Sequence, residues 1–227
     1  MINKTLKITK AISLFILFLT FSYIPAAIFN INLDNLSYNQ KIIYSFSCDL
    51  LFLIIIITAY HKTLIRDFKL FFKDFFKNFE TAFKYWFAGF LIMVISNIVI
   101  MFVMGGEIAQ NEEMVRTMIK QATLYMIFSI SIYAPLTEEL IFRKSIRDII
   151  SSKWIYILAS GLIFGGLHIL SSLESAIDLI YLIPYSSLGI AFAMCYYKTN
   201  NIFSTISMHC MHNTMALIIY LMAGTTL

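Results

Sequence analysis

The sequence predicts an all-α fold, a polytopic membrane helix bundle of about seven transmembrane helices with one additional amphipathic helix. Of its 227 residues, 59% are hydrophobic and only 13% are charged, whereas about 25% of the residues in a soluble globular protein are charged. The apolar residues gather in runs of about 20, the length of helix that crosses a bilayer. Most lysines and arginines lie in every second connection between these runs, as expected for cytoplasmic loops.

The predicted spans cover residues 11–30, 42–60, 84–104, 122–142, 153–171, 177–197 and 202–223. If the N-terminus is cytoplasmic, only Lys41, Arg116 and Lys120 of the 17 basic residues lie outside. The positive-inside rule therefore predicts a multi-pass protein of the cell membrane, with its C-terminus outside. The net charge of +4 does not point to nucleic acid, because the basic residues are distributed as the loops of a membrane protein require. The lipid bilayer is the predicted partner. An uncleaved first span is favoured over a cleaved signal peptide because many apolar runs follow it.

Residues 64–83 carry phenylalanines at positions 68, 71, 72, 75, 76, 79 and 83, the rhythm of one helical face. Lys69, Lys73 and Lys77 recur on another face. This pattern predicts an amphipathic helix lying flat on an anionic leaflet on the cytoplasmic side. A partner-binding helix is the alternative.

Polar side chains also occur at membrane depth in the second and third predicted spans. Asp49 lies in the second, and Ser96 and Asn97 lie in the third. For each we expect a hydrogen bond between helices that holds the bundle together. Asp49 facing a cavity is the alternative.

The fourth predicted span ends in Thr137-Glu138-Glu139-Leu140-Ile141-Phe142-Arg143, which places three formal charges beside an apolar run. A carboxylate in hydrocarbon costs ~3 kcal/mol on insertion scales, so two adjacent ones require a reason. Glu139 and Arg143 are four residues apart and can pair on one helical face. Glu138 points elsewhere and is predicted to be free to act as a base. Pro135 is expected to disturb the helix beside the acids. Alternatively, the charges simply end a span at the membrane surface.

Two later spans carry histidines within apolar sequence. Phe164 and His168 share a face of the fifth span, and His209 and Asn213 share a face of the seventh, with His212 nearby. Counted from the adjacent turns, Glu138 and His168 both lie about 20 Å deep, and His209 lies about 16 Å deep. We therefore expect these groups to converge in a water-filled cavity inside the bilayer.

Three motifs in separate spans resemble one known family. EExxxR (Glu138 to Arg143), FxxxH (Phe164 to His168) and HxxxN (His209 to Asn213) are similar in type and order to those of the CPBP family. This family comprises CAAX-type proteases and bacteriocin-processing enzymes and is also called the Abi family. The resemblance covers residues 124–223, and Lys144 departs from the glycine common after the arginine. It implies an N-terminal membrane region at 1–120 and a catalytic core of four spans at 121–227.

The resemblance implies an intramembrane endopeptidase whose substrate is a peptide or protein at the membrane. By this resemblance, Glu138 is the general base with His168 as its partner, and His209 and Asn213 stabilise the oxyanion. Glu139, Arg143 and Phe164 would support them. A metal-independent mechanism is favoured, and the alternative is a zinc ion held by Glu138, His168 and His209, a known kind of catalytic zinc set.

Two non-proteolytic functions are alternatives. The chain could be a membrane scaffold or a bacteriocin self-immunity protein of the same fold, although a scaffold need not keep the complete polar set. It could also be a transporter that uses buried acids and histidines as relays, although no inverted repeat is evident in the sequence.

Overall fold

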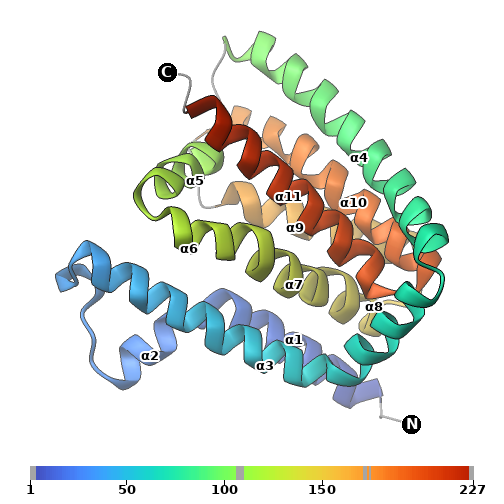
Figure 1. Cartoon of the computed structure of the whole chain (residues 1–227), viewed down its shortest axis with the longest axis horizontal. Helices are drawn as coiled ribbons and strands as arrows, with labels where there is room; N and C mark the ends of the chain where they lie inside the picture. Colours follow the sequence, from blue (N-terminus) through green and yellow to red (C-terminus); the bar gives the residue numbers. More distant parts are fainter. Residues whose placement is uncertain (1–3, 106–109, 171–172, 174, 225–227) are drawn as a thin grey trace.

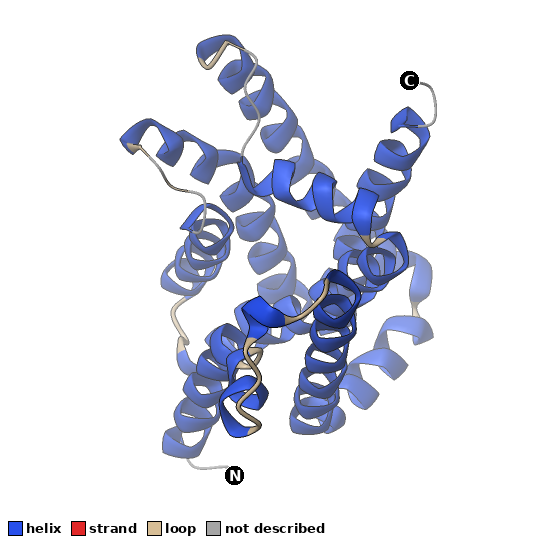
Figure 2. Ribbon diagram, turned by 90° about the vertical axis from the view of Figure 1, so that its left-hand side faces the viewer, coloured by secondary structure: helices blue, strands red, loops and turns tan. Residues whose placement is uncertain are grey.

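The computed structural model describes residues 4–105, 110–170, 173 and 175–224. Every regular element in these ranges is a helix, which confirms the all-α membrane bundle (Figures 1 and 2). The N-terminal elements are α1 (Lys4–Thr20), α2 (Tyr23–Ile28), the 3-10 turn η1 (Leu33–Asn35), α3 (Tyr38–Lys73), α4 (Phe75–Val103) and α5 (Gln110–Gln121). The later elements are α6 (Thr123–Phe128), η2 (Ser129–Tyr133), α7 (Ala134–Glu138), η3 (Glu139–Ser145), α8 (Ile146–Ile149), α9 (Lys153–Leu170), η4 (Ala176–Tyr181), α10 (Leu182–Thr199) and α11 (Ile202–Gly224).

Six helices in the described part of the chain are long and apolar enough to cross a membrane. They match the second to seventh predicted spans: Tyr38–Lys73, Phe75–Val103, Thr123–Ile149, Lys153–Leu170, Ala176–Thr199 and Ile202–Ala223. The first predicted span, 11–30, is instead divided between α1 and α2.

The division of the first span still leaves α1 packed along α3. Lys10 donates to the carbonyl of Ala59 at one end, and Tyr44 donates to the carbonyl of Ser22 at the other. The two helices are therefore antiparallel over about 23 Å. The helix breaks before Pro25, which has no N–H to continue the hydrogen-bond ladder. The count of seven was thus approximate.

Residues 64–83 do not form one separate helix. The stretch is the end of α3 and the start of α4, which meet at Asp74. The side chain of Asn78 donates to the carbonyls of Leu70 and Phe71 at 3.0 and 2.9 Å, so it satisfies acceptors that the end of α3 leaves free. The break turns several of the phenylalanines outward, and Phe76 is 85% exposed.

Helix α10 lies at the centre of the C-terminal half, between α9 and α4 (Figure 1). Gly161 and Gly165 of α9 allow the close approach of α10. A Cβ atom on Gly161 would lie 2.9 Å from the nitrogen of Ile190, and one on Gly165 would lie 2.8 Å from that of Ser186. Small residues at such contacts let helix backbones pack directly in a membrane.

The start of α11 is held by a residue of α3. Asp67 is fully buried, and its carboxylate accepts a hydrogen bond of 2.9 Å from the backbone N–H of Ile202. Asn201 donates to the carbonyl of Asp67 at 2.9 Å. The carboxylate thus caps a helix N-terminus from another helix and satisfies a free N–H. This contact sets the position of the helix that carries His209 and Asn213.

The polar residues in the second and third predicted spans differ in their hydrogen-bond partners. Tyr125 of α6 donates to the Asp49 carboxylate at 2.8 Å, which is a hydrogen bond between helices. Ser96 instead donates to the carbonyls of Ile92 and Met93 in its own helix, at 2.7 and 2.9 Å. Asn97 is exposed. The prediction for Ser96 was wrong because a hydroxyl reaches the preceding turn of its own helix more easily than a neighbouring helix.

Candidate active site

The two adjacent glutamates lie where the fourth helix changes its hydrogen-bonding pattern. α7 ends at Glu138, and the π-helical segment η3 begins at Glu139. A second π-helical segment, η2, lies one turn earlier, before Pro135. Such segments within α-helices are frequent at functional sites. The sequence predicted a disturbance at Pro135 but not the π-helical turn that follows it.

Glu139 and Arg143 form a fully buried ion pair. The Nε atom of Arg143 lies 3.1 Å from Oε2 of Glu139, and both side chains have 0% exposure. The atoms are close but not aligned as a hydrogen bond. Removing water from both charges costs several kcal/mol for each ion, so each requires further contacts.

Arg143 obtains those contacts from α9 and α10. Its NH1 group donates to Ser160 at 3.3 Å, and its guanidinium lies 4.7 Å from the ring centre of Phe164 and 5.7 Å from that of Phe192. The Ser160 hydroxyl in turn donates to the carbonyl of Phe142 at 2.7 Å. Aromatic faces attract a cation most strongly where water is excluded. Phe164 therefore helps to hold the arginine.

His209 lies between the two glutamates. Its Nδ1 atom is 2.9 Å from Oε1 of Glu139, and its Nε2 atom is 3.8 Å from Oε2 of Glu138. Because the Glu139 carboxylate is the acceptor at Nδ1, that nitrogen carries a proton, and Nε2 is the ring atom that faces Glu138. The imidazole is also stacked on Phe192, with ring centres 5.3 Å apart. The structure thus gives Glu139 a contact with His209 in addition to the contact with Arg143 that the sequence predicted.

Glu138 keeps more exposure than its neighbour. Its side chain is 15% exposed, against 0% for Glu139. A partly exposed carboxylate beside a fully buried ion pair is the one that water or a substrate can reach. As the sequence predicted, Glu138 and Glu139 therefore lie in different surroundings.

His168 has a fixed ring orientation. Its Nδ1 atom lies 2.8 Å from the carbonyl of Phe164, so Nδ1 donates and Nε2 is the ring nitrogen left for other partners. The ring stacks on Tyr185 of α10, with centres 5.1 Å apart. Phe142 packs against Phe164, which places Glu138 near the level of His168 on the neighbouring helix. No hydrogen bond or ion pair joins Glu138 to His168 within the described residues.

Asn213 bonds to the backbone of the helix that bears the acids. Its amide donates to the carbonyl of Ile130 at 3.1 Å. In a π-helix that carbonyl would accept from residue 135, but Pro135 has no N–H, and Ala134 donates to Ser129 instead. Asn213 therefore satisfies an acceptor that proline leaves free and ties α11 to η2.

His212 does not join this group. Its ring lies 6.4 Å from that of Trp86 and 6.1 Å from that of Phe90, on the side of α11 that faces α4. Three surrounding residues escaped the sequence reasoning: Ser160, Tyr185 and Phe192. Ser160 carried a usable signal, since it precedes Phe164 and His168 at intervals of four residues. Tyr185 and Phe192 lie on another helix, so no spacing pointed to them.

The alternative metal set of Glu138, His168 and His209 does not match the arrangement of these side chains. In the parts of the chain that the structure describes, no group of three or more His, Cys, Asp or Glu side chains is placed to hold a metal ion. Glu138, His168 and His209 do not form such a group as placed. The side chains instead contact one another or the backbone.

Comparisons with known proteins point to one family. Residues 120–215 match the family described as "Type II CAAX prenyl endopeptidase Rce1-like". The protein "Putative membrane peptidase YdiL" of Bacillus subtilis (strain 168) is 33% identical over 142 residues, which is 59% of this chain and 54% of that protein. The chain thus spans about half the length of the curated relative it matches. No solved structure matches significantly.

The matched region contains α6 to α10 and most of α11, and all three motifs lie inside it. The apolar helices and the family match together identify a multi-pass membrane protein. The resemblance inferred from the three motifs is confirmed. Over residues 120–215, this chain is similar to the type II CAAX prenyl endopeptidase family, in agreement with the resemblance to the CPBP family.

Proposed function

We propose that this protein is a membrane-embedded endopeptidase that hydrolyses a peptide bond of a membrane-associated protein or peptide. One observation carries the proposal: Nε2 of His209 lies 3.8 Å from the Glu138 carboxylate while Glu139 holds the other ring nitrogen at 2.9 Å. A carboxylate that fixes the orientation of a histidine is a recurrent device in hydrolases. The family match supports the reaction class.

In the proposed reaction, Glu138 takes a proton from a water molecule whose oxygen attacks the scissile carbonyl carbon. His168, with its Nε2 available, helps to orient that water. The proton then passes from Glu138 to the leaving amine as the carbon–nitrogen bond breaks. A positioned general base of this kind contributes about 10²- to 10⁴-fold to the rate.

His209 and Asn213 are proposed to stabilise the oxyanion. A proton on Nε2 of His209 would balance Glu138, just as Arg143 balances Glu139, so the four groups together would carry no net charge. The Asn213 amide uses one N–H on the carbonyl of Ile130 and has a second to offer. A donor aimed at a developing oxyanion contributes about 3–4 kcal/mol.

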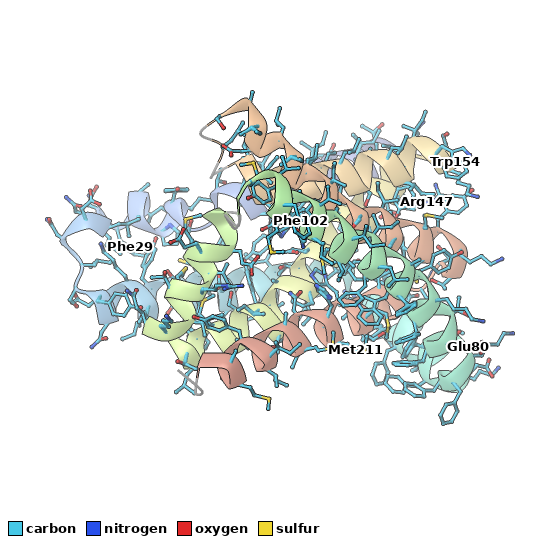
Figure 3. All side chains as sticks on the ribbon, turned by 90° about the horizontal axis from the view of Figure 1, so that it is seen from above. Phe29, Glu80, Phe102, Arg147, Trp154 and Met211 are labelled. Atoms are coloured by element: carbon cyan, nitrogen blue, oxygen red, sulfur yellow. The ribbon has the colours of Figure 1, made fainter. Side chains whose placement is uncertain are left out.

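We further propose that residues 121–227 form the catalytic core and residues 1–120 an N-terminal membrane region. All the proposed site side chains come from the core. The α3–α4 junction and α8 lie toward the same end as the N-terminus in Figure 1. Figure 3 places Glu80, Arg147 and Trp154 at that end and Phe29 at the opposite end. Most basic residues belong to segments at this end, so we propose that it faces the cytoplasm.

The test compares peptides in membranes from cells that express the wild type, Glu138→Gln, His168→Ala or the control Glu113→Gln. Glu113 is an exposed acid of α5, outside the site. We expect a set of cleaved peptides that depends on Glu138 and His168 but not on Glu113. Processing that survives both site changes would refute the protease proposal and favour a scaffold or self-immunity protein.

The purified protein separates the two mechanisms. Cleavage of a peptide found in that comparison is measured with a strong chelator and again after zinc is restored. We expect activity to persist in the chelator. Loss in the chelator and recovery with zinc would instead assign the metal alternative on Glu138, His168 and His209.

A further inference from the structure

A lateral groove runs between α4 and α10, away from the proposed site. Its volume is about 470 Å³, within the range of sites that bind small molecules. Apolar side chains form much of its walls, and basic side chains from two different helices also line it. Its lining includes Lys84, Ala88 and Ile92 of α4 and Ile190, Met194 and Lys198 of α10.

The register of the two helices places both lysines at one end of the groove. A Cβ atom on Gly89 would lie 3.1 Å from the carbonyl oxygen of Ser187, and the Ser187 hydroxyl donates to the carbonyl of Gly89. Helices α4 and α10 run in opposite directions (Figure 1), so Lys84 and Lys198, which both line the groove, lie on the same side of this contact. Ile92 is eight residues beyond Lys84, which is about 12 Å along the helix. The groove is therefore basic at one end and apolar along its length.

Charge decides which occupant fits. Lys84 pairs with Glu80, but both side chains are well exposed, at 71% and 65%, and such a pair contributes little. Lys198 is exposed and forms no ion pair with any residue that the structure describes. The basic end thus retains positive charge for an anion.

We propose that this groove binds an anionic phospholipid, with its phosphate between Lys84 and Lys198 and one acyl chain along Ile92, Ile190 and Met194. A membrane helix surface that is apolar along its length and basic at one end matches the order of groups in such a lipid. Basic pockets between membrane helices bind anionic headgroups for the same reason. The distance of about 12 Å from Lys84 to Ile92 lies within one leaflet of a hydrocarbon core about 30 Å thick.

Native mass spectrometry of the full chain in detergent measures the binding of palmitoyl-oleoyl phosphatidylglycerol and of the matching phosphatidylcholine. We expect the wild type to prefer the anionic lipid. The double variant Lys84→Gln/Lys198→Gln should lose that preference, by about 30-fold for two lysines. The control Lys73→Gln/Lys77→Gln removes the same charge from exposed lysines near the α3–α4 junction and should change the preference less than twofold.

A second variant tests the groove without removing charge. Ala88 is exposed on the groove wall. The change Ala88→Trp should therefore fill the groove and weaken the binding of both lipids while the protein stays folded. Inorganic phosphate added in excess should not displace the lipid. The proposal is overturned if both lysine pairs have equal effects, if Ala88→Trp leaves lipid binding unchanged, or if phosphate alone competes fully.

Discussion

Replacing Glu139 by glutamine should destabilise the fold strongly, although the side chain keeps its size. Arg143 has no exposure and lies 3.1 Å from Glu139. The amide would still reach His209, but it would leave a buried guanidinium without its counter-ion. Breaking a buried ion pair from one side costs about 3–5 kcal/mol. The contacts of Arg143 with Ser160 and Phe164 would remain, so we expect the lower end, about 3 kcal/mol.

The assay is thermal unfolding of the purified protein in detergent. In a chain of this size, about 3 kcal/mol corresponds to a fall in Tm of about 6–12 °C. The matched control is Glu112→Gln, which removes the acid of the exposed i,i+4 pair with Arg116. An exposed pair of this spacing contributes about 0.3–0.5 kcal/mol, so its Tm should fall by no more than about 2 °C.

A double-mutant cycle completes the test. Arg143→Met alone leaves Glu139 buried without its cation and should also be strongly destabilising. Glu139→Gln/Arg143→Met removes both charges and should recover much of the loss, because two uncharged side chains no longer require each other. If Glu139→Gln lowers Tm no more than Glu112→Gln does, the buried pair does not hold this helix and the reasoning is wrong.

Two further predictions concern the packing of α9 against α10 and the Ile130 carbonyl that Pro135 leaves without a backbone donor. Both are measured by thermal unfolding. Gly165→Ala places a Cβ atom 2.8 Å from a backbone nitrogen of α10 and should cost about 1–3 kcal/mol. Gly166→Ala meets nothing within 4 Å and should be neutral or stabilise the helix by up to about 1 kcal/mol; equal effects of the two changes would contradict the packing. Asn213→Leu leaves the carbonyl of Ile130 without its side-chain donor and should cost about 1–3 kcal/mol. The additional change Pro135→Ala supplies a backbone N–H in the same helix and should recover part of the lost stability. If no stability is recovered, the carbonyl of Ile130 has another donor.

Local spacing predicted much of the site. The i,i+4 relation of Glu139 and Arg143 implied their pairing, and the atoms are 3.1 Å apart. The same spacing placed Phe164 beside His168, and their ring centres are 4.5 Å apart. These contacts lie within single helices, where periodicity determines which side chains share a face. The roles of the residues in catalysis stay predictions.

Contacts between helices could not be read in the same way. The sequence predicted that Glu139 pairs with Arg143, but it did not predict the contact of Glu139 with His209. That contact joins residues 70 positions apart. It also missed Asp67, which reaches the start of α11 from α3. Residues 64–83 have a continuous amphipathic pattern, yet the chain turns at Asp74, where Asn78 caps the carbonyls of the preceding helix.

The sequence by itself determined that the protein is a helical membrane bundle and which three motifs are candidates for its chemistry. Apolar run length and helical periodicity are local properties, and the bilayer requires each spanning segment to satisfy its own backbone hydrogen bonds. Only the tertiary structure decided which polar groups meet. Pro135 and the π-helical turns shift the faces of the fourth helix, and the glycines of α9 set how closely α10 approaches. With the contact of Asp67 at the start of α11, this packing brings His209 between the two glutamates.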